Sequence, residues 1–123
     1  PDLPRDDDVL TDAELSVYSE ALSRNGFFGP SSYYMNHEAN GSYAFRSLNG
    51  DVLDMPVLFI AAEYDFTCES IASRLAEPMR DHCPDLTVRV VESGHWVAQE
   101  KPFEVNAALA RWLATSLSDV WPK

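Results

Sequence analysis

Residues 11–26 follow the hydrophobic pattern of an amphipathic helix with both ends marked. Apolar side chains recur three and four residues apart, which aligns them on one helical face: Leu15, Tyr18 and Leu22. The segment begins with Thr-Asp-Ala-Glu, in which Thr11 and Glu14 can form a capping box. It ends at Asn25-Gly26, and glycine commonly closes a helix. The pattern predicts a helix over about residues 12–25.

The second half of the chain alternates between strand-like and helix-like segments. Residues 57–61 form a continuous apolar run, typical of a strand covered on both faces in a parallel sheet, and residues 86–91 form a second β-rich run. Between them we predict a helix over about residues 69–81, kinked or ended early by Pro78. A last helix begins at Pro102. This β-α-β-α order predicts parallel strands joined by a right-handed crossover.

The other segments are less regular. Gly29-Pro30-Ser31-Ser32 fits a turn that opens a short, aromatic-rich helical segment at residues 33–35, whereas residues 39–54 look irregular and polar. Residues 1–9 are rich in aspartate and contain two prolines, which predicts a solvated acidic tether.

The length of 123 residues suffices for one domain core, but the strand pattern does not fill one. Two parallel strands leave both sheet edges open, and an independent sheet usually needs at least three strands. We therefore expect the chain to be a fragment of a larger α/β fold, although its mass would also suit a small, complete protein.

Charge and composition exclude several classes of protein. Nine Lys and Arg face twenty Asp and Glu, a net charge of −11 that argues against binding to nucleic acid or to anionic membranes. No apolar run approaches the ~18 residues that a membrane span requires. The first residues do not read as a signal peptide, and one upstream of Pro1 stays open.

The two cysteines, Cys68 and Cys83, do not form a disulfide scaffold, which favours reduced thiols and a cytoplasmic compartment. Together with three scattered histidines they do not match the spacing of a zinc site. We expect neither a metal nor a cofactor.

Two polar residues follow the predicted strands at matching offsets. Asp65 lies four residues beyond the strand at 57–61, and His95 lies four beyond the strand at 86–91. Because functional residues of parallel sheets gather at the carboxyl ends of strands, both side chains should share one rim. There a carboxylate can orient an imidazole that acts as a general base.

The order of these residues matches the acid and the histidine of an α/β-hydrolase triad, in which the nucleophile comes first. The chain contains no Gly-x-Ser-x-Gly, no equivalent elbow with Asp or Cys, and no His-Gly oxyanion loop. In that fold, the nucleophile elbow and the oxyanion loop would both lie upstream of a segment such as this one.

From about Leu10 to Leu117, the chain resembles the C-terminal part of an α/β-hydrolase-fold epoxide hydrolase of the soluble type. The stretch at 10–36, with its helix, Gly-Phe-x-Gly-Pro and tyrosine pair, is the narrowest signal. Four stretches carry the resemblance: LTDAELSVYSEALSRNGFFGPSSYYMN at 10–36, MPVLFIAAEYDF at 55–66, ESGHWVAQEKPFEVN at 92–106 and ALARWL at 108–113.

This resemblance implies a domain organisation. Residues 10–54 would be the C-terminal part of the helical lid, which follows the tether at 1–9. Residues 55–123 would be the C-terminal βαβα part of the hydrolase core.

The resemblance also implies a mechanism. In the family, an upstream Asp opens a small-molecule epoxide to form an ester, two lid tyrosines bind and protonate its oxygen, and the histidine activates water to release a vicinal diol. Tyr34 matches the second lid tyrosine, Asp65 the orienting acid and His95 the base, while Phe66 and Trp96 match substrate-binding pocket positions. The nucleophile, the first lid tyrosine and the oxyanion loop have no counterpart, so we expect no turnover without the missing N-terminal part of the fold.

Three alternatives stay open. Tyr33 is a rival to Tyr34 as the proton donor. The shared acid and histidine would equally suit a haloalkane dehalogenase or an ester hydrolase. A non-catalytic protein could instead use the aromatic segment and the open strands to bind a partner or to form a homo-oligomer.

Overall fold

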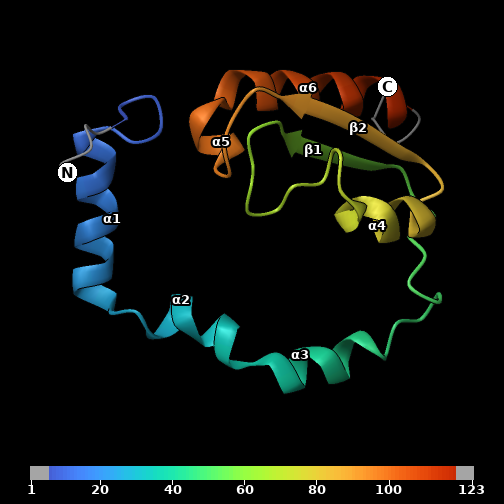
Figure 1. Ribbon diagram of the computed structural model, residues 1–123, viewed down its shortest axis with the longest axis horizontal. Coiled ribbons are helices and arrows are strands. Elements are labelled where there is room, and N and C mark those ends of the chain that lie inside the picture. The colour runs from blue at the N-terminus through green and yellow to red at the C-terminus, as the bar shows by residue number, and fades with distance from the viewer. Residues whose placement is uncertain (1–5, 119–123) are drawn as a thin grey trace. The chain divides into compact units, whose positions relative to one another are not determined.

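The chain divides into two compact units, Pro1–Gly50 and Asp51–Lys123. The structure, a computed structural model, describes residues 6–118. The first unit is helical, and Figure 1 colours it blue to green. Its elements follow one another closely: α1 (Asp12–Asn25), α2 (Phe28–Ser32), the 3₁₀ helix η1 (Tyr33–Met35) and α3 (His37–Ala44).

Helix α1 confirms the predicted bounds and both predicted caps. The Thr11 hydroxyl accepts from the Glu14 amide, and the Thr11 amide donates to the Glu14 carboxylate at 2.9 Å. At the other end Gly26 adopts a φ of 71°, a left-handed value that costs glycine little, and its amide donates to the Leu22 carbonyl at 2.8 Å. The apolar stripe stays open to solvent, since Leu15 is 44% exposed.

Helix α3 contradicts the expectation that residues 39–54 are irregular throughout. Its first turn is closed by the Asn40 amide, which donates to the Asn36 carbonyl at 2.9 Å. The Asn36 side chain also donates to the Asn40 side chain at 3.2 Å. The sequence of α3, His-Glu-Ala-Asn-Gly-Ser-Tyr-Ala, has no stripe of large apolar residues by which hydrophobic periodicity could reveal the helix.

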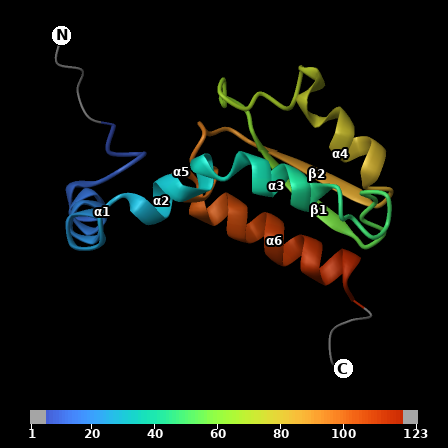
Figure 2. The same ribbon diagram turned by 90° about the horizontal axis from the view of Figure 1, so that it is seen from below.

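The second unit confirms the predicted β-α-β-α order. Strands β1 (Val57–Ala62) and β2 (Leu86–Val91) pair in parallel, with Val57 opposite Leu86 and Ala62 opposite Val91. Figures 1 and 2 show α4 and α6 on opposite sides of these strands. The helical elements of this unit are η2 (Arg74–Ala76), α4 (Glu77–His82), α5 (Val97–Glu100) and α6 (Pro102–Ser116).

The helix predicted over residues 69–81 is wrong in its first half. The Glu69 carboxylate accepts from the amides of Ile71 at 2.7 Å, Ala72 at 2.8 Å and Ser73 at 2.6 Å, which holds this segment as an irregular turn. Regular helix starts later, so Pro78 falls in the first turn of α4 rather than in a helix interior. There its missing N–H leaves no hydrogen bond unmade.

The core of the second unit is small. Its buried apolar residues are Ala61, Ala76, Cys83 and Val91. Within residues 6–118, each strand has a strand neighbour on one side only, so one edge of β1 and one edge of β2 are open. Cys68 and Cys83 are both free thiols, the first exposed and the second buried. Among the described helices, none has the length and apolar character needed to cross a membrane.

Candidate active site

The sheet register brings together the two loops that follow β1 and β2. Ala62 and Val91, the last residues of the strands, lie opposite each other. Beyond them the Glu63 amide donates to the Val91 carbonyl at 2.8 Å, and the Tyr64 amide donates to the Ser93 carbonyl at 2.9 Å. The two loops therefore remain tied by backbone hydrogen bonds after the strands end.

Asp65 and His95 meet where these loops run side by side. The His95 Nδ1 lies 2.9 Å from the Asp65 Oδ2, although 30 residues separate them along the chain. The Asp65 side chain is 12% exposed and the His95 side chain 48% exposed. The structure thus places the carboxylate beneath an imidazole that remains accessible.

Hydrogen bonds hold Asp65 in its ionised form. The backbone N–H of Cys68, at 2.9 Å from Oδ1, is the largest cause that lowers the Asp65 pKa from its ordinary value, and the His95 hydrogen bond is the next. The Thr67 amide adds a further bond to Oδ1 at 3.1 Å. An ionised carboxylate oxygen can only accept, so Nδ1 of His95 carries the proton in the hydrogen bond to Asp65 Oδ2. The Nε2 atom is then an acceptor, as a general base requires.

Glu100 braces the loop that carries His95. Its carboxylate accepts from the Gly94 amide at 2.6 Å and from the Trp96 amide at 3.2 Å, the two residues that flank the histidine. A Cβ at position 94 would lie 2.9 Å from the Glu100 Oε1, so a larger residue there would require the Glu100 carboxylate to shift. Sequence reasoning missed Glu100. The signal that could have found it is an acidic residue at the end of a short helix, whose carboxylate can reach backwards to the backbone amides of the preceding loop.

The three aromatic residues predicted to contact substrate have different environments. The Trp96 ring meets the His95 ring edge to face, with centroids 5.5 Å apart, and Trp96 is 66% exposed. Phe66 is 89% exposed. Tyr34 lies in the first unit, where its ring packs edge to face on Tyr33 at 5.5 Å. Within the second unit, the structure thus brings the Trp96 ring against the His95 ring.

Negative charge surrounds this end of the sheet. The Glu63 carboxylate, and to a smaller extent the Glu92 carboxylate, raise the pKa of Tyr64 above its ordinary value because the phenolate would repel both.

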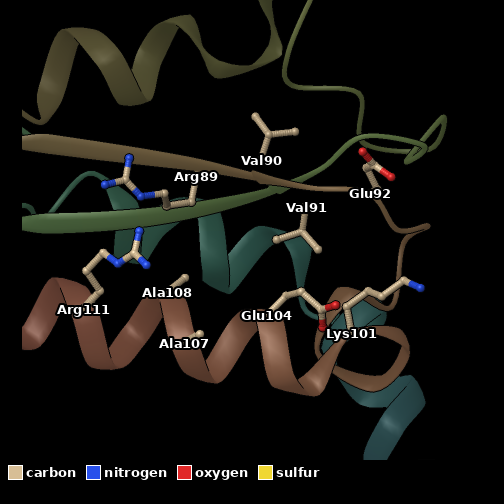
Figure 3. A pocket seen from close by; sticks show the side chains of 9 residues that line it. All are labelled: Arg89, Val90, Val91, Glu92, Lys101, Glu104, Ala107, Ala108 and Arg111. Atoms are coloured by element: carbon tan, nitrogen blue, oxygen red, sulfur yellow. The ribbon is translucent and has the colours of Figure 1, made fainter.

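A hollow of about 470 Å³ lies elsewhere in this unit, between β2 and α6. Figure 3 shows Arg89 and Arg111 on its walls, from the strand and the helix respectively, with Glu104 and Lys101 nearer α5. Asp65 and His95 do not line it. The Asp65–His95 pair is therefore separate from this hollow, on the rim formed by the loops.

Comparison with known proteins identifies relatives, although no family model matches the chain. Bifunctional epoxide hydrolase 2 of Rattus norvegicus is 31% identical over 120 residues, which cover 97% of this chain and 21% of the rat protein. Epoxide hydrolase B of Mycobacterium tuberculosis is 33% identical over 106 residues, or 85% of this chain and 29% of that protein. Epoxide hydrolase A of the same organism is 33% identical over 109 residues, or 85% and 32%.

The chain therefore spans about a fifth to a third of the length of these curated relatives. Its two parallel strands with flanking helices form the mixed α/β arrangement expected at the end of a hydrolase core. These relationships place the chain among the epoxide hydrolases of the α/β-hydrolase fold, as a C-terminal part of such a protein.

Proposed function

We propose that this chain provides the orienting acid and the general base of an epoxide hydrolase whose nucleophile lies outside residues 1–123. The observation that carries this proposal is the 2.9 Å contact between Asp65 and His95 at the carboxyl ends of adjacent parallel strands. The names of the relatives supply the substrate class, an epoxide.

The proposed reaction has two steps. A carboxylate from outside the chain attacks one epoxide carbon, so that a carbon–oxygen bond of the ester forms as the epoxide carbon–oxygen bond breaks. His95 Nε2 then removes a proton from water, whose oxygen attacks the ester carbonyl. The bond between the carbonyl carbon and the substrate oxygen breaks, the departing oxygen takes the proton from the imidazolium, and the vicinal diol and the free carboxylate result. Asp65 stabilises the imidazolium that forms, since its carboxylate already accepts from Nδ1.

Tyr34 is proposed as the acid for the first step. A phenol can donate a proton to the opening epoxide oxygen near neutral pH, and a positioned acid of this kind contributes about 10²–10⁴-fold. The ring is 69% exposed, and thus available to a ligand on its own unit. Phe66 and Trp96, on the second unit, are proposed as further substrate-binding residues.

The open strand edges support a partner for this chain. One edge of β1 offers unpaired backbone groups, and the buried core of the unit is small. We propose that the upstream part of the same fold pairs with this edge. The chain alone should therefore produce no diol, and adding the upstream part should restore activity.

The proposal can be tested by trapping the ester in a protein that joins this chain to its upstream part. In His95→Gln the epoxide should still alkylate the carboxylate, but hydrolysis should stop, so the intact mass should rise by one epoxide. His37→Gln, a histidine in the first unit, is the matched control and should give diol without an adduct.

Absence of diol from the complete wild-type protein with aryl and alkyl epoxides would refute the proposal. An adduct that forms only from haloalkanes would favour a dehalogenase instead. Association of the upstream part with this chain would exclude the alternative in which two copies of the chain pair through the open edge of β1. Stable dimers of the complete protein through β1 would support that alternative.

A further inference from the structure

A thiol lies beside the Asp65–His95 pair. One potential ligand atom from each of Asp65, Cys68 and His95 lies within 4.8 Å of the other two. The spacing along the chain does not match a zinc site because the histidine belongs to a different loop from the other two residues, and the parallel register of β1 and β2 brings them together. We propose that these three side chains bind one borderline-soft divalent cation of the Zn²⁺ class.

The turn after β1 holds two of the ligands in place. Asp65 Oδ1 accepts from the amides of Thr67 and Cys68, which curls the chain so that Cys68 returns toward the carboxylate. Oδ1 is thereby occupied, while Oδ2 faces the His95 ring. Cys68 is exposed and free, so its Sγ can turn toward an ion without disturbing a packed core.

The distances are close to those of a tetrahedral zinc site. With bonds of ~2.0 Å to nitrogen and oxygen and ~2.3 Å to sulfur, ligand atoms lie roughly 3.3–3.6 Å apart. The Asp65 Oδ2 and His95 Nδ1 are 2.9 Å apart and need to separate slightly. One ligand atom from each of the three residues lies within 4.8 Å of the other two, so Cys68 Sγ needs only a short approach. Rotation of one exposed cysteine side chain supplies that approach.

The donor set selects the metal. A thiolate, an imidazole and a carboxylate suit Zn²⁺ or Co²⁺ rather than Mg²⁺ or Ca²⁺, which prefer oxygen ligands. Water would complete the fourth position. On binding, Cys68 loses its thiol proton to solvent and the imidazole proton moves from Nδ1 to Nε2, so about one proton is released for each ion bound.

Electrostatics favours a cation at this rim. The chain carries a net charge of −11, and the carboxylates of Glu63 and Glu92 lie near the same strand ends. If the proposed function holds, an ion at Nδ1 would displace the bond to Asp65 and place a proton on Nε2. With Nε2 protonated, His95 could no longer act as the base, so a bound metal ion would inhibit the proposed hydrolysis.

The binding itself can be tested on the reduced chain without any assay of hydrolysis. Titration with Co²⁺ should give a thiolate-to-cobalt charge-transfer band that saturates at one ion per chain and disappears when Zn²⁺ is added. Cys68→Ser should abolish this band, and His95→Gln should weaken binding at least about tenfold. His37→Gln is the matched control and should bind as the wild type does. Far-ultraviolet circular dichroism would verify that each variant retains its secondary structure.

Three outcomes would overturn the proposal. The band could persist in Cys68→Ser, which would move the ion to Cys83. Cobalt could bind without a sulfur band and without sensitivity to His95→Gln, as at the acidic residues near the N-terminus. Cobalt could also fail to bind at all. None of these results bears on epoxide turnover, so failure of the metal site and failure of the proposed function remain distinguishable.

Discussion

Replacing Glu100 with alanine tests whether its carboxylate holds the His95 loop. The variant removes two hydrogen bonds, from the Gly94 amide at 2.6 Å and from the Trp96 amide at 3.2 Å. The first is short and partly buried, and a hydrogen bond to a charged group contributes about 1.5–3 kcal/mol. Since ~1.36 kcal/mol corresponds to a factor of ten, local opening at Gly94 should become roughly 10- to 160-fold more frequent.

Amide hydrogen exchange measured residue by residue would report this change. The Gly94 amide should exchange faster by that factor and the Trp96 amide by less, because its bond is longer and exposed. Amides within β1 and β2 should keep their protection, since the ladder between the strands is untouched. Glu100→Gln keeps one neutral acceptor and should fall between alanine and wild type.

Glu104→Ala is the control, since it removes a carboxylate from an exposed position in the next helix, four residues along the chain. It should leave exchange at Gly94 unchanged. Equal exchange at Gly94 in Glu100→Ala and in wild type would refute the idea that this carboxylate restrains the loop. Faster exchange spread evenly over both strands would refute it too, because the effect would then be global.

Further predictions concern Asp65, Tyr34 and the first helix. Because the Asp65 pKa is lowered in the folded chain, ionised Asp65 should contribute fully to stability above its unfolded pKa of about 3.9. That contribution should be lost as the pH falls through the lower folded pKa. Acid unfolding of Asp65→Asn, followed by circular dichroism, should therefore depend less on pH in that window than acid unfolding of the wild type. In the complete protein Tyr34→Phe should lower kcat by up to about 10²–10⁴-fold, whereas Tyr33→Phe should stay near wild type, and the reverse order would reassign the acid. Thr11→Ala should destabilise α1 by about 1 kcal/mol through loss of its cap, measured as faster amide exchange in its first turn, and unchanged exchange there would argue against the capping box.

The contact between Asp65 and His95 could be predicted because the ends of both strands can be recognised in the sequence. An uninterrupted apolar run marks β1, a β-rich run marks β2, and parallel pairing then fixes which residues share a rim. Asp65 and His95 followed from those two strands alone. Helix α1 was equally legible, since Thr11 and Gly26 mark its ends by side-chain and backbone chemistry that is local.

Contacts that depend on a particular side-chain rotamer could not be predicted from the sequence. Glu69 and Glu100 each use a carboxylate to satisfy backbone amides, one replacing a helical turn and the other bracing a loop. The hydrophobic pattern around them is the same whether the carboxylate turns inward or faces water. The proximity of Cys68 to the Asp65–His95 pair could not be predicted for a similar reason, because the position of Cys68 depends on how the turn after β1 closes on Asp65.

The open edge of β1 has a consequence for how the chain can be produced and handled. Its sequence, Val-Leu-Phe-Ile-Ala-Ala, is a six-residue window with high hydrophobicity and no charge, the composition typical of intermolecular β-aggregation. Synthesis exposes this window before β2 exists, for about 1.5–6 s at ~5–20 residues per second. Pro56 and Glu63 flank the window and act as gatekeepers, since a proline cannot extend a strand ladder and a carboxylate repels its copies. We therefore expect the two residues that border the strand, Pro56 and Glu63, to limit aggregation through this window.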